Sequence, residues 1–178
     1  MLYYKHKFNT IPIRKARGKN MFYHLFFIVL IAGAAWCAWR ISVADMRRRI
    51  IPDAYLFPLM LAGLLILAFF GDRWVCGVGD AAIGAAFGYA LGAGIGAVFE
   101  YIQSRRNPDA QTPIGFGDIK LLAVGGLWLG VGGLAWALIA SCAFGAIWAR
   151  VNKAKFIPFA PFFIAGSILT LIGMFFLV

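Results

Sequence analysis

Five long apolar runs, separated by short charged segments, determine what this 178-residue chain can fold into. A helix needs about 20 predominantly apolar residues to cross the hydrocarbon core of a bilayer, and each run is close to that length or longer. Hydrophobic residues make up 62% of the chain and charged residues only 13%, compared with about 25% charged residues in soluble domains. The composition therefore predicts an all-α, polytopic membrane protein that folds as one bundle. The runs span residues 22–44, 54–70, 81–99, 119–149 and 156–178.

The fourth run is 31 residues long, too long for one ordinary span and short for two. Gly130, Gly132 and Gly133 interrupt it near its middle, and we expect two short helices there. A bundle of about six transmembrane helices results. It comprises residues 22–178 as a single transmembrane domain, preceded by a basic tail at residues 1–21.

Glycines recur at every fourth position along the third run. On a helix this spacing forms a stripe without side chains, which lets a neighbouring helix approach closely. We therefore expect the third helix to lie at the centre of the bundle, with the stripe in a structural role. The four glycines are Gly84, Gly88, Gly92 and Gly96.

The charge and the cysteine content narrow the function classes. A net charge of +10 would suggest nucleic-acid binding in a soluble chain, but here the basic residues flank the apolar runs. That pattern is typical of membrane orientation and of contact with anionic lipid in the bilayer, so no nucleic-acid partner is expected.

The widely separated Cys37, Cys76 and Cys142 form no CxxC pair and no cysteine–histidine cluster. Neither a structural zinc site nor another metal or cofactor is therefore expected.

The distribution of basic residues also predicts the orientation. With six spans, the first, third and fifth connections share one side, and they hold ten basic residues against one, Arg73, in the second and fourth. The positive-inside rule places those three connections in the cytoplasm. The N-terminal tail does not follow this rule, because its six basic residues fall on the side opposite to the cytoplasm. Either the tail is translocated despite its charge, or the native chain begins at Met21, and we favour the second explanation.

Two acids lie at the edges of apolar runs, where a charged side chain is costly and calls for an explanation. Asp45 follows the first run, and Asp118 stands behind two spaced glycines at the start of the fourth. The orientation places both acids at the cytoplasmic edge, where they can meet. Two carboxylates in one site share a proton, so that one accepts a proton from water while the other polarises a scissile carbonyl. This pair suggests an aspartic protease, and Gly115 and Gly117 would let an extended substrate pass close to Asp118.

The Gly-x-Gly-Asp pattern also occurs at residues 77–80, so the motif alone is weak evidence. Asp80 begins the third helix from the opposite face, and we interpret it as an acid that stabilises a helix N-terminus. Simpler interpretations stay open for the other acids as well. Asp118 could serve only as a helix N-terminal acid, and Asp45 only as an ion-pair partner of the neighbouring arginines. Asp53 is interpreted as a helix-start residue.

Four features together resemble the type IV prepilin peptidases and their archaeal preflagellin relatives, a group of GxGD aspartyl proteases. The resemblance covers the chain from about Phe22 to its end, and the combination is far more specific than any one motif. The features are Asp45 followed by Ile51-Pro52-Asp53, Gly115-Phe116-Gly117-Asp118 followed by Ile119-Lys120-Leu121-Leu122, the order and spacing of the two acids, and Ile157-Pro158-Phe159-Ala160-Pro161-Phe162 at the start of the last helix.

The resemblance implies a membrane-embedded aspartic endopeptidase whose catalytic residues are Asp45 and Asp118. Its substrate would be a type IV prepilin or pseudopilin, cut at the cytoplasmic face of the inner membrane to release the basic leader peptide, in a pilus or protein-secretion system. Larger bacterial members carry an additional N-methyltransferase domain with paired CxxC motifs. The first connection here is only about ten residues long, so we expect a minimal peptidase without methyltransferase activity.

Further substrate contacts are expected from residues next to Asp118 and from acids of the third connection, which would meet the basic leader. Lys120 could also hold an anionic lipid headgroup or tune the acid pair, and simple snorkelling to the interface is an equal alternative. The candidates are Gly115, Gly117, Lys120 and Glu100, with Asp109 as a second acid of that connection.

Two other function classes stay open at this point. A small proton-coupled transporter would need acids distributed through the depth of the membrane, whereas these acids lie at one edge. An inactive assembly protein of a pilus or secretion apparatus is the second class, and the presence of both motif acids disfavours it. The sequence also leaves open whether the chain forms a homodimer.

Overall fold

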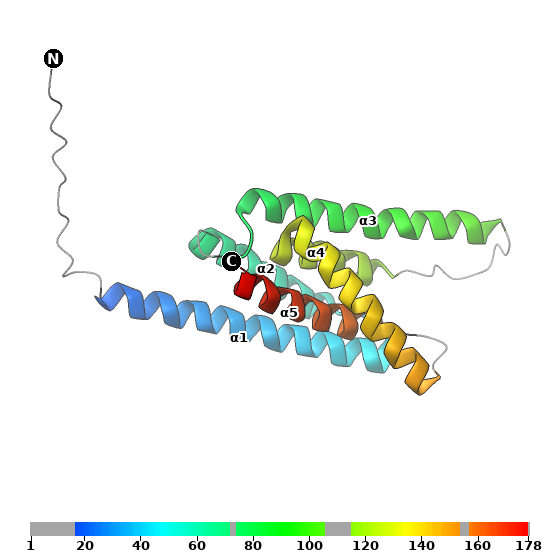
Figure 1. Cartoon of the computed structure of the whole chain (residues 1–178), viewed down its shortest axis with the longest axis horizontal. Helices are drawn as coiled ribbons and strands as arrows, with labels where there is room; N and C mark the ends of the chain where they lie inside the picture. Colours follow the sequence, from blue (N-terminus) through cyan, green and yellow to red (C-terminus); the bar gives the residue numbers. More distant parts are fainter. Residues whose placement is uncertain (1–16, 72–73, 106–114, 154–156, 178) are drawn as a thin grey trace, which may run out of the picture.

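The computed structural model describes residues 17–71, 74–105, 115–153 and 157–177, and the secondary structure of these residues is entirely helical (Figure 1). Each of the five helices is long and apolar enough to cross a membrane. The chain is therefore a multi-pass membrane protein, as the composition predicts. The helices are α1 (Arg17–Arg48), α2 (Asp53–Phe70), α3 (Val78–Ser104), α4 (Phe116–Asn152) and α5 (Phe159–Leu177).

Helix α4 contains the predicted interruption. Gly130 has a φ of 69° and a ψ of −176°, a positive-φ conformation that favours glycine, and a Cβ at this position would also clash with the Asp80 carboxylate. The chain turns back here, and Figure 1 shows both ends of α4 toward the same end of the bundle. The sequence predicts about six helices, and the described residues form five, because the two arms of the fourth apolar run are joined into α4 at this one residue. The two arms of α4 stand in place of the two short helices.

The connection between α2 and α3 supplies hydrogen-bond partners at the break in α4. The Trp128 carbonyl oxygen accepts hydrogen bonds from Trp74 Nε1 at 3.0 Å and from Cys76 Sγ at 3.7 Å. Beyond the break, the Val131 N–H donates to Asp80 Oδ1 at 3.4 Å. Backbone groups away from water need such partners, so this connection fixes where α4 folds back.

The glycine stripe of α3 makes a close contact with α4, but α3 is not the central helix. A Cβ at Gly84 would clash with the Gly126 carbonyl group, and a Cβ at Gly88 would clash with that of Leu122. The stripe therefore has the structural role that the sequence predicts. The central helix is α4, which is far more buried than α3, and the expectation for α3 is wrong. A stripe of glycines fits one close neighbour and does not require neighbours on every side.

Buried apolar side chains concentrate where α1, α2, α4 and α5 meet. Many large apolar side chains are exposed on the outside, which suits helices surrounded by lipid, because lipid tails are as apolar as those side chains. Among the described residues, Asp45 is the only charged residue that is buried. The largest fully buried side chains are those of Ile41, Leu56, Ile66, Leu121, Leu129, Leu134 and Phe163.

Helix α1 is longer than the first apolar run. It continues through Asp45 to Arg48, so the connection to α2 comprises only residues 49–52 rather than about ten residues. Asp45 consequently lies inside the last turn of a helix and not beyond its end. Residues 1–16 of the basic tail lie outside the described residues, and the explanations for the tail stay predictions.

Candidate active site

Asp45 is held in place by the beginning of α5. Its side chain is 6% exposed, and its Oδ2 accepts a hydrogen bond of 2.8 Å from the Ala160 N–H. The Phe159 N–H is a second backbone donor to the same carboxylate. Both donors belong to the first turn of α5, where the positive end of the helix dipole favours an anion. The carboxylate therefore has a fixed orientation and compensation for its burial.

The sequence before Ala160 explains why α5 begins at Asp45. Pro158 precedes the helix and fixes its own φ, and Pro161 occupies the first turn, where a missing N–H removes no helical hydrogen bond. The two residues between these prolines are the ones that donate to Asp45. The Ile157-Pro158-Phe159-Ala160-Pro161 motif thus forms an anion-binding helix N-terminus.

Asp118 lies in the first turn of α4 and is half-buried. Its Oδ2 accepts a hydrogen bond of 3.3 Å from the Gly115 N–H, and its own N–H donates to the Gly115 carbonyl oxygen at 3.0 Å. This reciprocal pairing caps the helix. The simpler interpretation of Asp118 as a helix N-terminal acid is therefore part of its role. Within the described residues, Asp118 Oδ1 accepts no hydrogen bond.

The structure brings Asp45 and Asp118 together at one end of the bundle. Their carboxylates lie within range of direct electrostatic repulsion. The positive guanidinium group of Arg49 attracts the Asp45 carboxylate. The interpretation of Asp45 as a partner of the neighbouring arginines therefore also has support in the structure. Arg49 has a positive φ of 53°, and its N–H donates to the Asp45 carbonyl oxygen at 2.9 Å, which ends α1 immediately beside the acid pair.

Gly117 allows the connection between α1 and α2 to pack over the beginning of α4. A Cβ at Gly117 would lie 2.8 Å from the Ile51 Cβ, closer than real Cβ atoms approach. Ile51 is itself buried. A Cβ at Gly115 would lie 3.5 Å from Asp118 Oδ2 and 4.0 Å from the Gly117 nitrogen, both ordinary contact distances, and Gly115 is exposed. Of the two motif glycines, Gly117 has a packing role and Gly115 faces the outside.

Lys120 forms an ion pair with Asp53 and not with either candidate catalytic acid. Its Nζ lies 2.7 Å from Asp53 Oδ2 and 3.0 Å from Oδ1, and it lies 5.8 Å from the ring centre of Phe57. Asp53 stands in the first turn of α2, as predicted. Both charged side chains are partly exposed, so the pair stabilises the fold by about 0–1 kcal/mol and mainly joins the beginnings of α2 and α4.

The remaining candidates lie apart from the acid pair. Glu100 is an exposed residue of α3, and within the described part of the chain it makes no hydrogen bond or ion pair. Asp109 lies outside the described residues. Asp80, from the second Gly-x-Gly-Asp copy, is in the first turn of α3 and contacts the break in α4, twelve residues along that helix from Asp118. No group of three or more histidine, cysteine, aspartate or glutamate side chains that could hold a metal ion exists among the described residues.

A model of the type IV leader peptidase family matches residues 31–150, which include both acids and the Gly-x-Gly-Asp motif at residues 115–118. The matched stretch is well over half of the chain. The chain belongs to the type IV leader peptidase family. This membership confirms the resemblance that the sequence motifs suggest.

Relatives in the type IV leader peptidase family match most of this chain but only part of their own length. A prepilin leader peptidase/N-methyltransferase of Aeromonas salmonicida (strain A449) is 32% identical over 146 residues, which cover 78% of this chain and 47% of the relative. One of Bacillus subtilis (strain 168) is 34% identical over 139 residues, 72% of this chain and 49% of the relative. The chain thus spans about half the length of the curated relatives it matches. No solved structure matches it.

Two contacts of this family member are missed by reasoning from the sequence. One is the pair of backbone N–H groups that hold Asp45, and the other is the contact of Ile51 with Gly117. The motifs that contain these residues are visible in the sequence as parts of the family resemblance. The physical roles of these residues are not visible in the sequence, because each role depends on two segments that meet only in the folded bundle.

Proposed function

We propose that the chain is a membrane-embedded aspartic endopeptidase that removes the basic leader peptide of type IV prepilin-like proteins at the cytoplasmic face of the inner membrane. The observation that carries this function is the meeting of Asp45 and Asp118 at one end of the bundle. Membership of the type IV leader peptidase family supports it. The curated relatives that match the chain are prepilin leader peptidases, and a prepilin or pseudopilin is accordingly the proposed substrate.

The acid pair would act through one shared proton. Because two adjacent carboxylates repel each other, one keeps a proton while the other is ionised, and the pair titrates as a unit. The ionised group accepts a proton from a water molecule, whose oxygen attacks the scissile carbonyl carbon. The protonated group donates a hydrogen bond to the carbonyl oxygen and stabilises the tetrahedral intermediate. The departing amine takes up the proton that the ionised group had accepted from water, the peptide bond breaks to leave a carboxylic acid and an amine, and the pair returns to its starting state.

The surroundings of the two acids differ, which suits a pair in which one carboxyl group is ionised and the other is protonated. Asp45 is buried against the beginning of α5, whereas Asp118 is only half-buried and borders the exposed Gly115. Water and substrate would therefore approach from the side of Asp118. The basic residues next to the site, Arg47 and Arg48 at the end of α1, favour a cytoplasmic position for this end of the bundle.

The function is tested by co-expressing the chain with a candidate prepilin and measuring leader cleavage. Asp45→Asn and Asp118→Asn should each abolish cleavage, because an amide cannot share the proton. Asp80→Asn is the matched control, since it changes the same motif at the other copy while keeping an oxygen that can accept the hydrogen bond from Val131. It should retain cleavage. Full cleavage by Asp118→Asn would contradict the proposed mechanism.

A further inference from the structure

Arg40 is a basic residue on the outward side of α1, at the level where the hydrocarbon core of a bilayer ends. Residues 22–39 contain no lysine, arginine, aspartate or glutamate, and as helix they rise roughly 27 Å. The hydrocarbon core is roughly 30 Å thick, so Arg40 stands close to the depth of the lipid phosphate groups. Arg40 is exposed, and within the described residues it forms no ion pair with an acid.

Two aromatic residues hold the guanidinium group of Arg40 in place. The central carbon of this group lies 5.1 Å from the ring centre of Tyr55 and 5.8 Å from that of Trp36. The two rings stand edge to face, with their centres 5.5 Å apart. Arg40 Nη2 also donates a hydrogen bond of 2.9 Å to the Tyr55 hydroxyl oxygen. A basic side chain that only extends to the interface keeps its mobility, whereas this one is fixed by contacts from both α1 and α2.

The cluster of Arg40, Tyr55 and Trp36 has more hydrogen-bond donors than acceptors. A guanidinium group has five N–H donors, and the Tyr55 hydroxyl oxygen accepts one of them. That hydroxyl group keeps its own proton for a further acceptor. Trp36 is 53% exposed, and within the described part of the chain its Nε1 donates no hydrogen bond. The arrangement therefore fits an anion that carries several oxygen atoms.

The acids at this end of the bundle do not occupy the cluster. Asp53, the only acid of α2, is paired with Lys120 at 2.7 Å. Asp45 follows Arg40 on α1, but it faces the bundle and is buried against the beginning of α5. Asp118 lies beside Asp45, on α4. The positive charge of Arg40 is therefore left for a partner from outside the described chain.

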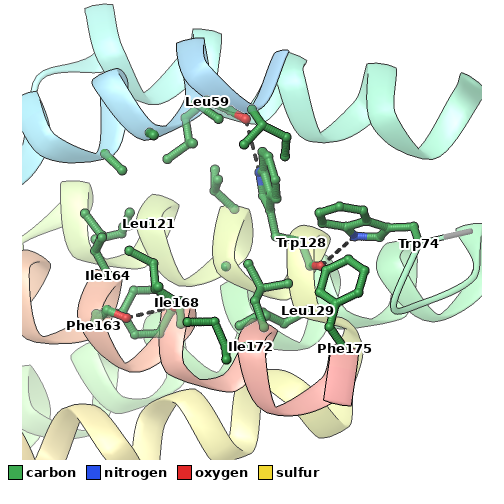
Figure 2. Close-up of a pocket in the computed structure, with 18 of the residues that line it drawn as sticks. Leu59, Trp74, Leu121, Trp128, Leu129, Phe163, Ile164, Ile168, Ile172 and Phe175 are labelled. Atoms are coloured by element: carbon green, nitrogen blue, oxygen red, sulfur yellow. Dashed lines mark hydrogen bonds between the residues drawn. The ribbon is translucent and has the colours of Figure 1, made fainter. Parts of the chain in front are cut away.

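The opposite side of α1 offers no such site. There, Ala34, Ala35 and Ala38 line a cavity of about 410 Å³ between α1, α2, α4 and α5 (Figure 2). Figure 2 shows the indole groups of Trp74 and Trp128 in its wall, and each indole N–H donates to a backbone carbonyl oxygen. The lining that the described residues provide includes no charged side chain. An anion would therefore be bound on the outside of α1 and not in this cavity.

We propose that Arg40, Tyr55 and Trp36 form a binding site for the headgroup phosphate of an anionic phospholipid, in the leaflet on the side of the acid pair. The free edge of the guanidinium group would donate two parallel hydrogen bonds to phosphate oxygens, the geometry that arginine favours. The Tyr55 hydroxyl group and the Trp36 indole N–H would donate to the other oxygens of the headgroup. This site is separate from the acid pair, and the proposal does not depend on the peptidase function.

The rest of this side of α1 favours a phospholipid with a net negative headgroup. Residues 47–49 are all arginine, and Arg47 is exposed two helical turns beyond Arg40, on the same side of the helix. These charges would repel the ammonium group of a zwitterionic headgroup but not the glycerol of phosphatidylglycerol. Toward the middle of the membrane, Gly33 and Val29 are exposed on the same side. They provide an apolar surface for the acyl chains of the lipid.

Lipid titration followed by native mass spectrometry tests this site. The protein in detergent is titrated with phosphatidylglycerol or with phosphatidylcholine of the same acyl chains, and the Kd of the first bound lipid is measured. For the wild type we expect a Kd for phosphatidylglycerol that is lower by roughly fivefold or more. Arg40→Gln should remove most of this preference, and so should Arg40→Lys, because lysine keeps the charge but lacks the planar group.

Arg150→Gln is the matched control for the lost charge. Arg150 stands in the last turn of α4, at the same end of the bundle but on another helix, and this variant should keep the preference of the wild type. Tyr55→Phe keeps the ring and removes the hydroxyl group, and it should weaken the binding of phosphatidylglycerol less than Arg40→Gln does. A preference that survives in Arg40→Gln, or that Arg150→Gln reduces equally, overturns the proposed site.

Photocrosslinking locates the lipid while Arg40 stays intact, so it also serves if the Arg40 variants fail to fold. Benzoylphenylalanine replaces Trp39, beside Arg40, or Val98 on α3, and these two residues are 59% and 58% exposed. Each protein is reconstituted in vesicles of equal amounts of phosphatidylglycerol and phosphatidylcholine. We expect the ratio of phosphatidylglycerol to phosphatidylcholine adducts to be roughly threefold higher at Trp39 than at Val98. Equal ratios at the two positions, or adducts at Trp39 with a second protein chain instead of lipid, would reject the proposal.

Discussion

The Ala160 N–H lies 2.8 Å from Asp45 Oδ2, so the beginning of the last helix is bound to an acid 115 residues earlier in the chain. This hydrogen bond joins the end of α1 to the beginning of α5 in the buried part of the bundle. It gives Asp45 a structural role in addition to its proposed catalytic one. The two roles can be separated by the choice of substitution.

Asp45→Asn and Asp45→Ala should differ in stability although both should abolish peptide cleavage. Asparagine keeps an oxygen that can accept the hydrogen bond from Ala160, whereas alanine leaves buried N–H donors without a partner. Each unsatisfied donor costs about 1–3 kcal/mol. Thermal unfolding in detergent should therefore show Asp45→Ala unfolding at a clearly lower temperature than Asp45→Asn. Equal unfolding temperatures would mean that this hydrogen bond does not anchor α5.

Gly117→Ala should destabilise the protein more than Gly115→Ala. The new Cβ at Gly117 collides with the Ile51 Cβ, while the new Cβ at Gly115 makes contacts at ordinary distances. Overpacking of this kind typically costs about 1–3 kcal/mol. Chemical unfolding measures the difference, and the double variant Gly117→Ala with Ile51→Gly, which removes the clashing Cβ, serves as the control. Adding Gly117→Ala to Ile51→Gly should lower the free energy of unfolding by less than adding it to the wild type.

Gly130→Ala should destabilise the fold, and Gly132→Ala should not. Gly130 combines a positive φ with a contact to the Asp80 carboxylate, whereas a Cβ at Gly132 would have open space. Positive φ alone costs alanine about 1–2 kcal/mol, and alanine in an ordinary helix is preferred over glycine by up to about 1 kcal/mol. Unfolding measurements on both variants test this contrast. A Gly130→Ala protein as stable as Gly132→Ala would show that the break tolerates a side chain.

The stability of the protein should fall between pH 9 and pH 11 partly because of Cys76. Burial, with a smaller contribution from the Asp80 carboxylate, raises the pKa of the Cys76 thiol from 9.0 to about 11. The unfolded chain therefore loses this proton at lower pH than the folded chain does, and stability decreases as the pH rises through that interval.

Serine at this position can donate the hydrogen bond to Trp128 but does not ionise in this range. Cys76→Ser should therefore show a smaller decrease in unfolding temperature between pH 9 and pH 11 than the wild type. Identical pH profiles of the two proteins would contradict the role of Cys76.

Much of the fold follows from local properties of the sequence. Each of the five apolar runs corresponds to one of the five described helices, and the glycine group within the fourth run predicts the interruption that the structure has at Gly130. The charge asymmetry predicts that Asp45 and Asp118 lie at the same end of the bundle, which they do. These features depend on chain length, hydrophobicity and charge, which can be counted along the sequence.

The rest depends on contacts between distant segments. The glycines of α3 indicate a close neighbour but not which helix it is, and α4 proves to be both that neighbour and the centre of the bundle. Lys120 follows Asp118 by two residues in the sequence, yet its partner is Asp53 on another helix. The partner of a flexible charged side chain is decided by three-dimensional packing, which spacing along the sequence does not reveal.

The fold-back at Gly130 has a consequence for hydrophobic mismatch. The first arm of α4, residues 116–129, spans roughly 21 Å, and the second arm, residues 131–152, spans roughly 33 Å. The hydrocarbon core of a bilayer is roughly 30 Å thick, so only the second arm matches it. Because the first arm is largely buried among the other helices, its shortness leaves Asp118 below the level of the neighbouring helix ends. The depth at which a membrane-anchored peptide meets the acid pair is thereby linked to the thickness of the bilayer.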